Sequence, residues 1–110
     1  MRYIELAKEV ALRGDPRRKH FLGAVAIRTD GVVVSSSNGT WLDRAPTQHA
    51  EAKVLRKAGR GAILFVARVG RNGTIGLSMP CRECRQLIRN KGVKRVYFTI
   101  DAIEIGTFYW

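Results

Sequence analysis

Apolar residues recur at helical spacing near the start of the chain. Within residues 2–13, one helical face gathers Ile4, Ala7, Val10 and Ala11. This spacing predicts an amphipathic helix, which Gly14-Asp15-Pro16 would end. Residues 21–38 then contain two apolar runs around Asp30-Gly31, a dipeptide typical of tight hairpin turns. We therefore expect two antiparallel strands after the first helix.

The remaining apolar runs alternate between helical and strand character. They predict a helix over 45–59 with Thr47 as its N-cap, a strand over 62–69, a helix over 81–92, and strands over 93–100 and 102–110. Helices that alternate with apolar strands indicate a sheet covered on both faces. The fold class predicted is α/β, a three-layer α/β/α arrangement with a central mixed sheet of four to five strands and about three helices.

Length and charge narrow the class of protein. The 110 residues, 45% of them hydrophobic, suit a single domain over 1–110. Because no apolar run reaches membrane-span length and the first residues lack the order of a signal peptide, we expect a cytoplasmic protein without a membrane partner. Twenty Lys and Arg against nine Asp and Glu give a formal charge of +11. That charge suits an anionic partner such as a nucleotide or nucleic acid, but it also suits simple solubility.

The only two cysteines, Cys81 and Cys84, stand three residues apart at the start of a predicted helix. Side chains at this spacing point the same way, and the free amides of a helix start favour thiolate over thiol. In a reducing compartment, such a pair indicates metal binding or redox chemistry more than a structural disulfide.

The two histidines, His20 and His49, decide between kinds of metal site. A closed structural zinc site takes four ligands, commonly from two close pairs. The two histidines are too far apart in the sequence to form the second pair. A catalytic zinc site takes three protein ligands and an open position, which His49, Cys81 and Cys84 would supply. A redox role for the two cysteines would leave the sequence "HAE" at residues 49–51 without a function. Glu51 is poorly placed to be a ligand and better placed to exchange protons with water at the open position.

The paired motifs "HAE" at 49–51 and "PCREC" at 80–84 carry a resemblance to a known family. They resemble the signature of the zinc-dependent cytidine and deoxycytidylate deaminase superfamily, over most of the chain from residue 23 to residue 99. The resemblance implies a cytidine-deaminase-like fold, a Zn²⁺ cofactor and hydrolytic deamination with Glu51 as the proton carrier. It also implies that Asn38 binds the sugar and that the Ala50 amide donates to the base carbonyl.

The resemblance leaves the substrate open. "GVKRVYF" at 92–98 is shared equally with deoxycytidylate and tRNA adenosine deaminases, whereas a final hairpin around "TIDAIE", residues 99–104, is found in the free cytidine deaminases. We therefore expect cytosine in a free nucleoside or nucleotide. Single-stranded DNA or RNA, including tRNA, is the alternative substrate, and a non-catalytic zinc-stabilised nucleic-acid-binding module is the alternative function.

The end of the chain also bears on assembly. It stops at Trp110, so we expect no C-terminal helical extension of the kind that many relatives use to cover the substrate. Another subunit would then complete the pocket, which predicts a homo-oligomer.

Overall fold

The computed structural model describes residues 2–17, 20–39 and 49–108, and side chains as far as Thr107. These residues form three helices: α1 (Arg2–Ala11), α2 (Ala50–Ala58) and α3 (Arg82–Asn90). Six strands form one sheet: β1 (His20–Ile27), β2 (Val33–Ser37), β3 (Ile63–Gly70), β4 (Ile75–Gly76), β5 (Arg95–Thr99) and β6 (Ile105–Phe108). Among these described helices, none combines the length and apolar character needed to cross a membrane.

The sheet is mixed, with strand order β2-β1-β3-β5-β6. β3 and β5 are parallel, and every other described pair is antiparallel. The parallel step occurs where α3 connects β3 to β5, since a connection between adjacent parallel strands must cross over the sheet. β5 and β6 form an antiparallel pair, which confirms the predicted final hairpin.

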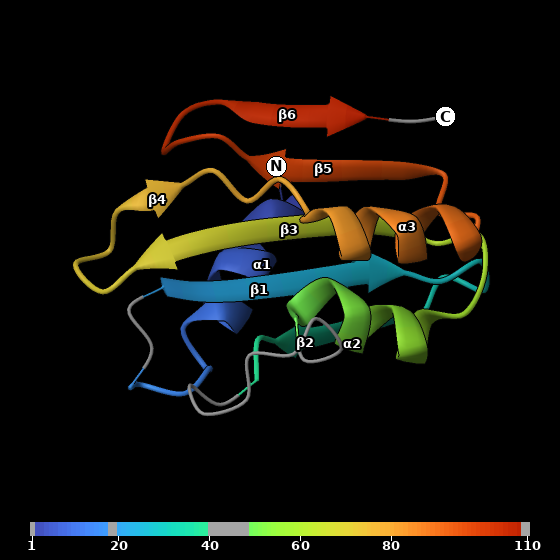
Figure 1. Cartoon of the computed structure of the whole chain (residues 1–110), viewed down its shortest axis with the longest axis horizontal. Helices are drawn as coiled ribbons and strands as arrows, with labels where there is room; N and C mark the ends of the chain where they lie inside the picture. Colours follow the sequence, from blue (N-terminus) through green and yellow to red (C-terminus); the bar gives the residue numbers. More distant parts are fainter. Residues whose placement is uncertain (1, 18–19, 40–48, 109–110) are drawn as a thin grey trace.

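Helices cover both faces of the sheet, which confirms the three-layer prediction (Figure 1). On one face α1 packs against Val25, Phe65 and Ala67, and on the other face α2 and α3 pack against Leu64 and Val66. The alternation along β3 follows from the two-residue period of a strand, which sends successive side chains to opposite faces. One strand therefore serves both cores.

The first helix lies unusually close to the sheet at Gly23 of β1. A Cβ atom at this position would stand 2.1 Å from the carbonyl oxygen of Ala7 and 2.4 Å from the backbone nitrogen of Ala11. Only glycine leaves room for the helix backbone at this distance.

Two details differ from the sequence-based expectation. The sheet has six strands instead of four to five, because the two-residue β4 pairs with Arg68 and Val69 of β3. A strand of two residues is too short to produce a detectable pattern of alternation. Helix α2 begins at Ala50 with His49 as its N-cap, so the expected cap at Thr47 was wrong, and Thr47 itself lies outside the described residues.

Candidate metal centre and active-site cleft

His49 occupies the N-cap position of α2. Its backbone is extended, with φ −64° and ψ 147°, and its side chain makes no capping hydrogen bond. Most N-cap side chains turn back to bond the first amides of the helix. The imidazole of His49 is therefore available to a ligand outside the helix.

The two cysteines occupy the start of α3 in the same manner. Cys81 is the N-cap, also extended and without a side-chain cap bond, while its carbonyl accepts from the Arg85 N–H at 2.8 Å. Cys84 lies within the first turn and is 1% exposed. The predicted placement of the pair at a helix start is confirmed.

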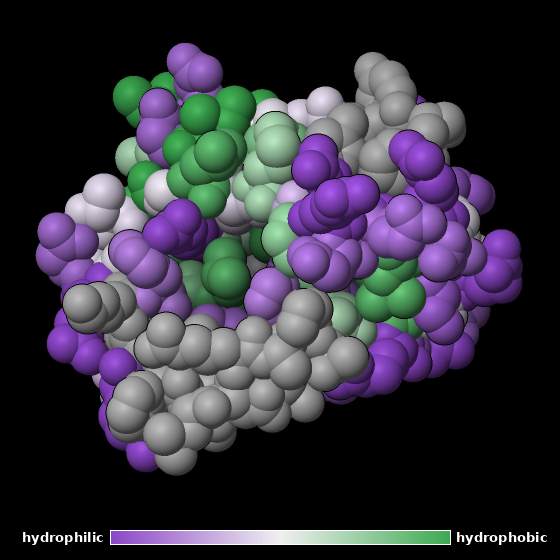
Figure 2. Space-filling view, viewed as in Figure 1, coloured by the Kyte–Doolittle hydropathy of each residue, from purple (hydrophilic) through white to green (hydrophobic). Residues whose placement is uncertain are grey.

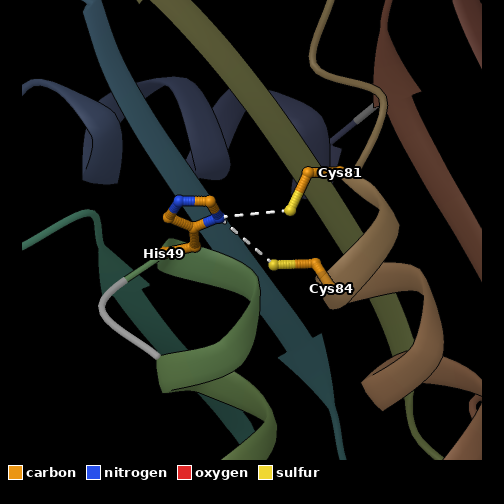
Figure 3. A group of neighbouring side chains, drawn as sticks. All are labelled: His49, Cys81 and Cys84. Atoms are coloured by element: carbon orange, nitrogen blue, oxygen red, sulfur yellow. Dashed lines mark hydrogen bonds between the residues drawn. The ribbon is translucent and has the colours of Figure 1, made fainter. Parts of the chain in front are cut away.

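The two helix starts bring three donor atoms together, although His49 is more than thirty positions from either cysteine in the sequence (Figure 3). Nδ1 of His49 lies 3.4 Å from Sγ of Cys81 and 3.4 Å from Sγ of Cys84. All three donors lie within 4.8 Å of one another. Tetrahedral zinc with bonds of about 2.0–2.3 Å places a nitrogen and a sulfur donor about 3.6 Å apart. The donor set therefore fits zinc in both chemistry and spacing.

The surroundings of the Cys84 thiol favour the binding of a cation. Burial raises the pKa of the Cys84 thiol, and the carboxylate of Glu51 and the neighbouring Cys81 raise it further. The Ala52 N–H, which hydrogen-bonds the Cys84 sulfur, acts in the opposite direction but is the smallest influence. Desolvation outweighs the helix amides, and a bound cation is what would stabilise the thiolate.

Glu51 lies in the first turn of α2 and is 4% exposed. Its Oε1 is buried and has no hydrogen-bond partner among the described residues, and burial raises the pKa of its carboxyl. Among those residues the group able to hold a metal is His49, Cys81 and Cys84, without Glu51. A buried carboxyl oxygen without a hydrogen-bond partner destabilises a fold, which indicates that Glu51 interacts with a ligand or a reacting group.

A cavity of about 290 Å³ opens over this group. Its described lining is His20, Leu22, Asn38, His49, Glu51, Arg68, Leu77, Ser78, Met79 and Cys81. Figure 2 shows the face that carries α2 and α3 hollowed beside the two helices. The volume is close to the lower end of the range for small-molecule sites.

Asn38 and Ala50, the two predicted substrate contacts, are both buried near this cavity. Asn38 lines it, yet its side chain also bonds the backbone of β1: Oδ1 accepts from the Leu22 N–H at 3.2 Å, and Nδ2 donates to the His20 carbonyl at 3.4 Å. Ala50 is the first residue of α2, between His49 and Glu51. Their roles in binding a sugar and a base carbonyl remain predictions.

Two features of this region, the Ser78–Thr99 pair and Arg68, were not predicted from the sequence. Ser78 and Thr99 are buried, and the Ser78 hydroxyl accepts from the Thr99 N–H, which supports the segment that leads to Cys81. Arg68 lines the cavity from β3. The feature of the sequence that could have revealed it is a basic residue within the otherwise apolar run at 62–69. His20, considered above as a possible ligand, lies in the cavity wall and outside the group of three donors.

Comparison with known proteins agrees with this geometry. The profile described as the cytidine and deoxycytidylate deaminase zinc-binding region matches residues 1–100. The chain belongs to the cytidine and deoxycytidylate deaminase family. A search of curated protein sequences gives no match.

Solved structures of cytidine deaminases share the fold of this family member. A glutamate-to-glutamine mutant of the Mycobacterium tuberculosis enzyme is 24% identical with a TM-score of 0.65, covering 93% of this chain and 84% of that one. The Mycobacterium leprae enzyme is 20% identical with a TM-score of 0.62, covering 94% and 88%. At these identities the likeness shows a common fold.

Proposed function

We propose that the protein is a zinc-dependent hydrolytic deaminase that converts cytosine to uracil in a free (deoxy)cytidine nucleoside or nucleotide. The observation that carries the proposal is Glu51, a buried residue whose Oε1 has no hydrogen-bond partner among the described residues, beside the three donors but outside their group. His49, Cys81 and Cys84 would hold the zinc. When bound there, zinc supplies a nucleophile by lowering the pKa of water to about 7.

Glu51 is the only residue with a proton-transfer role in this scheme. Its carboxylate takes the proton from the attacking water and delivers it to the ring nitrogen next to the amino-bearing carbon. The new C–O bond forms at that carbon. Glu51 then takes the remaining proton of the new hydroxyl group and gives it to the amino group, so that the C–N bond breaks and ammonia leaves as the carbonyl forms. The low exposure of Glu51 suits this role, because burial raises its pKa toward the working range of a general acid and base.

Two observations support cytosine as the base. The β5–β6 pair is antiparallel, the arrangement that the resemblance associates with free cytidine deaminases. The structurally similar solved proteins are cytidine deaminases. A polynucleotide substrate is the second candidate, and the charge of +11 favours it.

We further propose that the active form is a homo-oligomer. Leu77 and Met79 line the cleft and are 51% and 46% exposed, and Ile103 is 90% exposed. The Ser78 N–H bonds the Thr99 carbonyl, so the segment of Leu77 and Met79 lies beside the β5–β6 turn. A second copy could cover this apolar edge, and light scattering coupled to size exclusion measures whether it does.

Ammonia release with matched product analysis tests the function. The zinc-loaded protein is given cytidine, deoxycytidine, deoxycytidine monophosphate and a cytosine-containing single-stranded oligonucleotide. Turnover of a free pyrimidine supports the proposal, and turnover of the oligonucleotide alone overturns its substrate. Glu51→Gln should lose activity and keep its zinc, whereas Glu9→Gln, an exposed carboxylate on α1, should keep both. Zinc loss in Glu51→Gln would instead make that residue a ligand.

A further inference from the structure

A second cavity of about 550 Å³ adjoins the active-site cleft. The two cavities share His20 and Arg68 in their walls. The second one continues from these residues toward the β3–β4 turn, where Arg71, Asn72 and Thr74 line it. A ligand seated beside Glu51 could therefore extend past Arg68 into this space.

Arg68 stands on the face of β3 that points to the active site. It follows Leu64 and Val66 on the same side of the strand, where the core under α2 and α3 ends. Its neighbour across the sheet on β1 is Leu22, and on β4 it is Gly76. A Cβ added at Gly76 would meet the Arg68 side chain at 3.6 Å, so the arginine stem lies along β4.

The guanidinium of Arg68 has no partner in the part of the chain that the structure describes. Arg17 and Arg28, by contrast, form ion pairs with aspartates at 2.7 Å and 2.9 Å. The Arg68 side chain is only partly exposed and lies in a cavity wall. A guanidinium without a protein partner in such a place offers two parallel N–H donors to an oxyanion.

Arg71 adds a second positive charge to the second cavity, and His20 adds an imidazole that can hydrogen-bond an anion. Arg71 is anchored by its Nη2, which donates to the carbonyls of Pro16 at 3.4 Å and Arg17 at 3.1 Å. His20 begins β1 opposite Gly70 and is shared by both cavities. Among the described residues that line the second cavity, none is acidic. In Figure 2, hydrophilic side chains border the hollow on the side of the β3–β4 turn.

We infer that Arg68, with His20 and Arg71, forms a phosphate subsite, and that the preferred substrate is a pyrimidine nucleoside monophosphate. The inference rests on the proposed function, because it takes the base to lie beside Glu51. The sugar would then extend toward Arg68 and place its phosphate at the mouth of the second cavity. The basic groups converge on one cavity, which suits a single phosphate monoester better than a long strand.

A phosphodiester group of single-stranded nucleic acid could bind the same basic residues, so the test includes a short oligonucleotide. Equilibrium binding is measured by calorimetry on the wild-type protein with the products uridine, uridine monophosphate and an unphosphorylated thymidine trinucleotide. None of these ligands can be deaminated, so the measurement is independent of catalysis. Each protein is first checked for zinc content and thermal unfolding.

The expected result is that uridine monophosphate binds about 10–100-fold more tightly than uridine, the range for a charge-assisted bidentate contact. Arg68→Gln should bring this ratio close to one. Arg71→Gln, at an exposed turn residue, should lower it in part and serves if Arg68→Gln fails to fold. Arg28→Gln removes the same charge at the opposite end of β1 and should leave the ratio unchanged.

Equal affinity for uridine and its monophosphate, or no binding of either, overturns the phosphate subsite. So does a ratio that survives Arg68→Gln and Arg71→Gln. Tighter binding of the trinucleotide that depends on Arg68, without a preference for the monophosphate, also overturns it in favour of a strand. If uridine monophosphate binds through Arg68 but no cytosine substrate releases ammonia, the subsite stands and the proposed function fails.

Discussion

The hydroxyl oxygens of Ser78 and Thr99 lie 2.9 Å apart, buried between the segment that precedes Cys81 and the end of β5. The Ser78 hydroxyl donates to the Val66 carbonyl at 2.9 Å and accepts from the Thr99 N–H at 2.8 Å. The Thr99 hydroxyl donates to the Gly76 carbonyl at 2.7 Å and accepts from the Arg68 N–H at 3.2 Å. This network ties β3, β4 and β5 together and anchors the segment that leads to Cys81.

Thr99→Val should therefore weaken both the fold and the metal site. Valine keeps the shape but leaves the Arg68 N–H and the Gly76 carbonyl without their buried partner, which costs about 1–3 kcal/mol. Chemical denaturation measures the free energy of unfolding, and competition with a chelator measures zinc affinity. Thr99→Ser should restore most of the loss, and Thr107→Val on exposed β6 should change neither quantity. An unchanged zinc affinity in Thr99→Val would limit the network to a structural role.

Cys84→Ser should abolish tight zinc binding, because the alcohol is a poor ligand and the remaining pair cannot complete the site. Zinc binds the folded state, so the wild type should lose stability when a chelator is added. At a free zinc concentration 100 times the dissociation constant, the loss is about 2.7 kcal/mol. The comparison is a thermal unfolding curve with and without chelator. A wild-type curve that does not respond to the chelator would contradict a zinc site that stabilises the fold.

Gly23→Ala should destabilise the protein by about 3 kcal/mol, because the added methyl group meets the backbone of α1 and neither element can yield locally. Gly76→Ala is the matched control: it adds the same group to a strand, where it would meet the Arg68 side chain at ordinary contact distance. Denaturant midpoints of the two variants are compared. If both variants unfold at the wild-type midpoint, α1 does not pack against β1 as described.

Asp101 gives the β5–β6 hairpin a predictable dependence on pH. Its Oδ1 accepts from the N–H groups of Ile103 and Glu104, both at 2.8 Å, and these bonds lower the pKa of the carboxyl. A lowered pKa in the folded state means that the stabilisation is present at neutral pH. It is lost as the pH falls below the usual aspartate value, about 3.9, and through the lowered one.

Asp101→Ala should therefore lower the unfolding temperature at pH 7 and lower it by a smaller amount near pH 2. Thermal unfolding is recorded for the variant and the wild type across this range. The same difference at both ends of the range would show that the carboxylate charge is irrelevant to the turn.

Local sequence patterns predicted the features that depend on near neighbours. The helical spacing of residues 2–13, the Asp30-Gly31 turn and the two helix starts that carry the donors were all foreseen. The features that were missed depend on contacts between distant segments. β4 exists only because it pairs with β3, and the role of Arg68 depends on what lies beside it across the sheet. The raised pKa of Cys84 follows from burial, which no short stretch of sequence specifies.

The division of β3 between its two faces has a consequence for how this protein can change. Phe65 and Ala67 meet α1, while Leu64, Val66 and Arg68 form the opposite core and lead into the cleft. One residue inserted or deleted inside the strand would exchange these two sets, placing a guanidinium on the face that packs against α1 and a phenyl ring in the core under α2 and α3. Natural variation in substrate preference should therefore arise by replacing Arg68 or by altering the β3–β4 turn, and the length of β3 should stay constant.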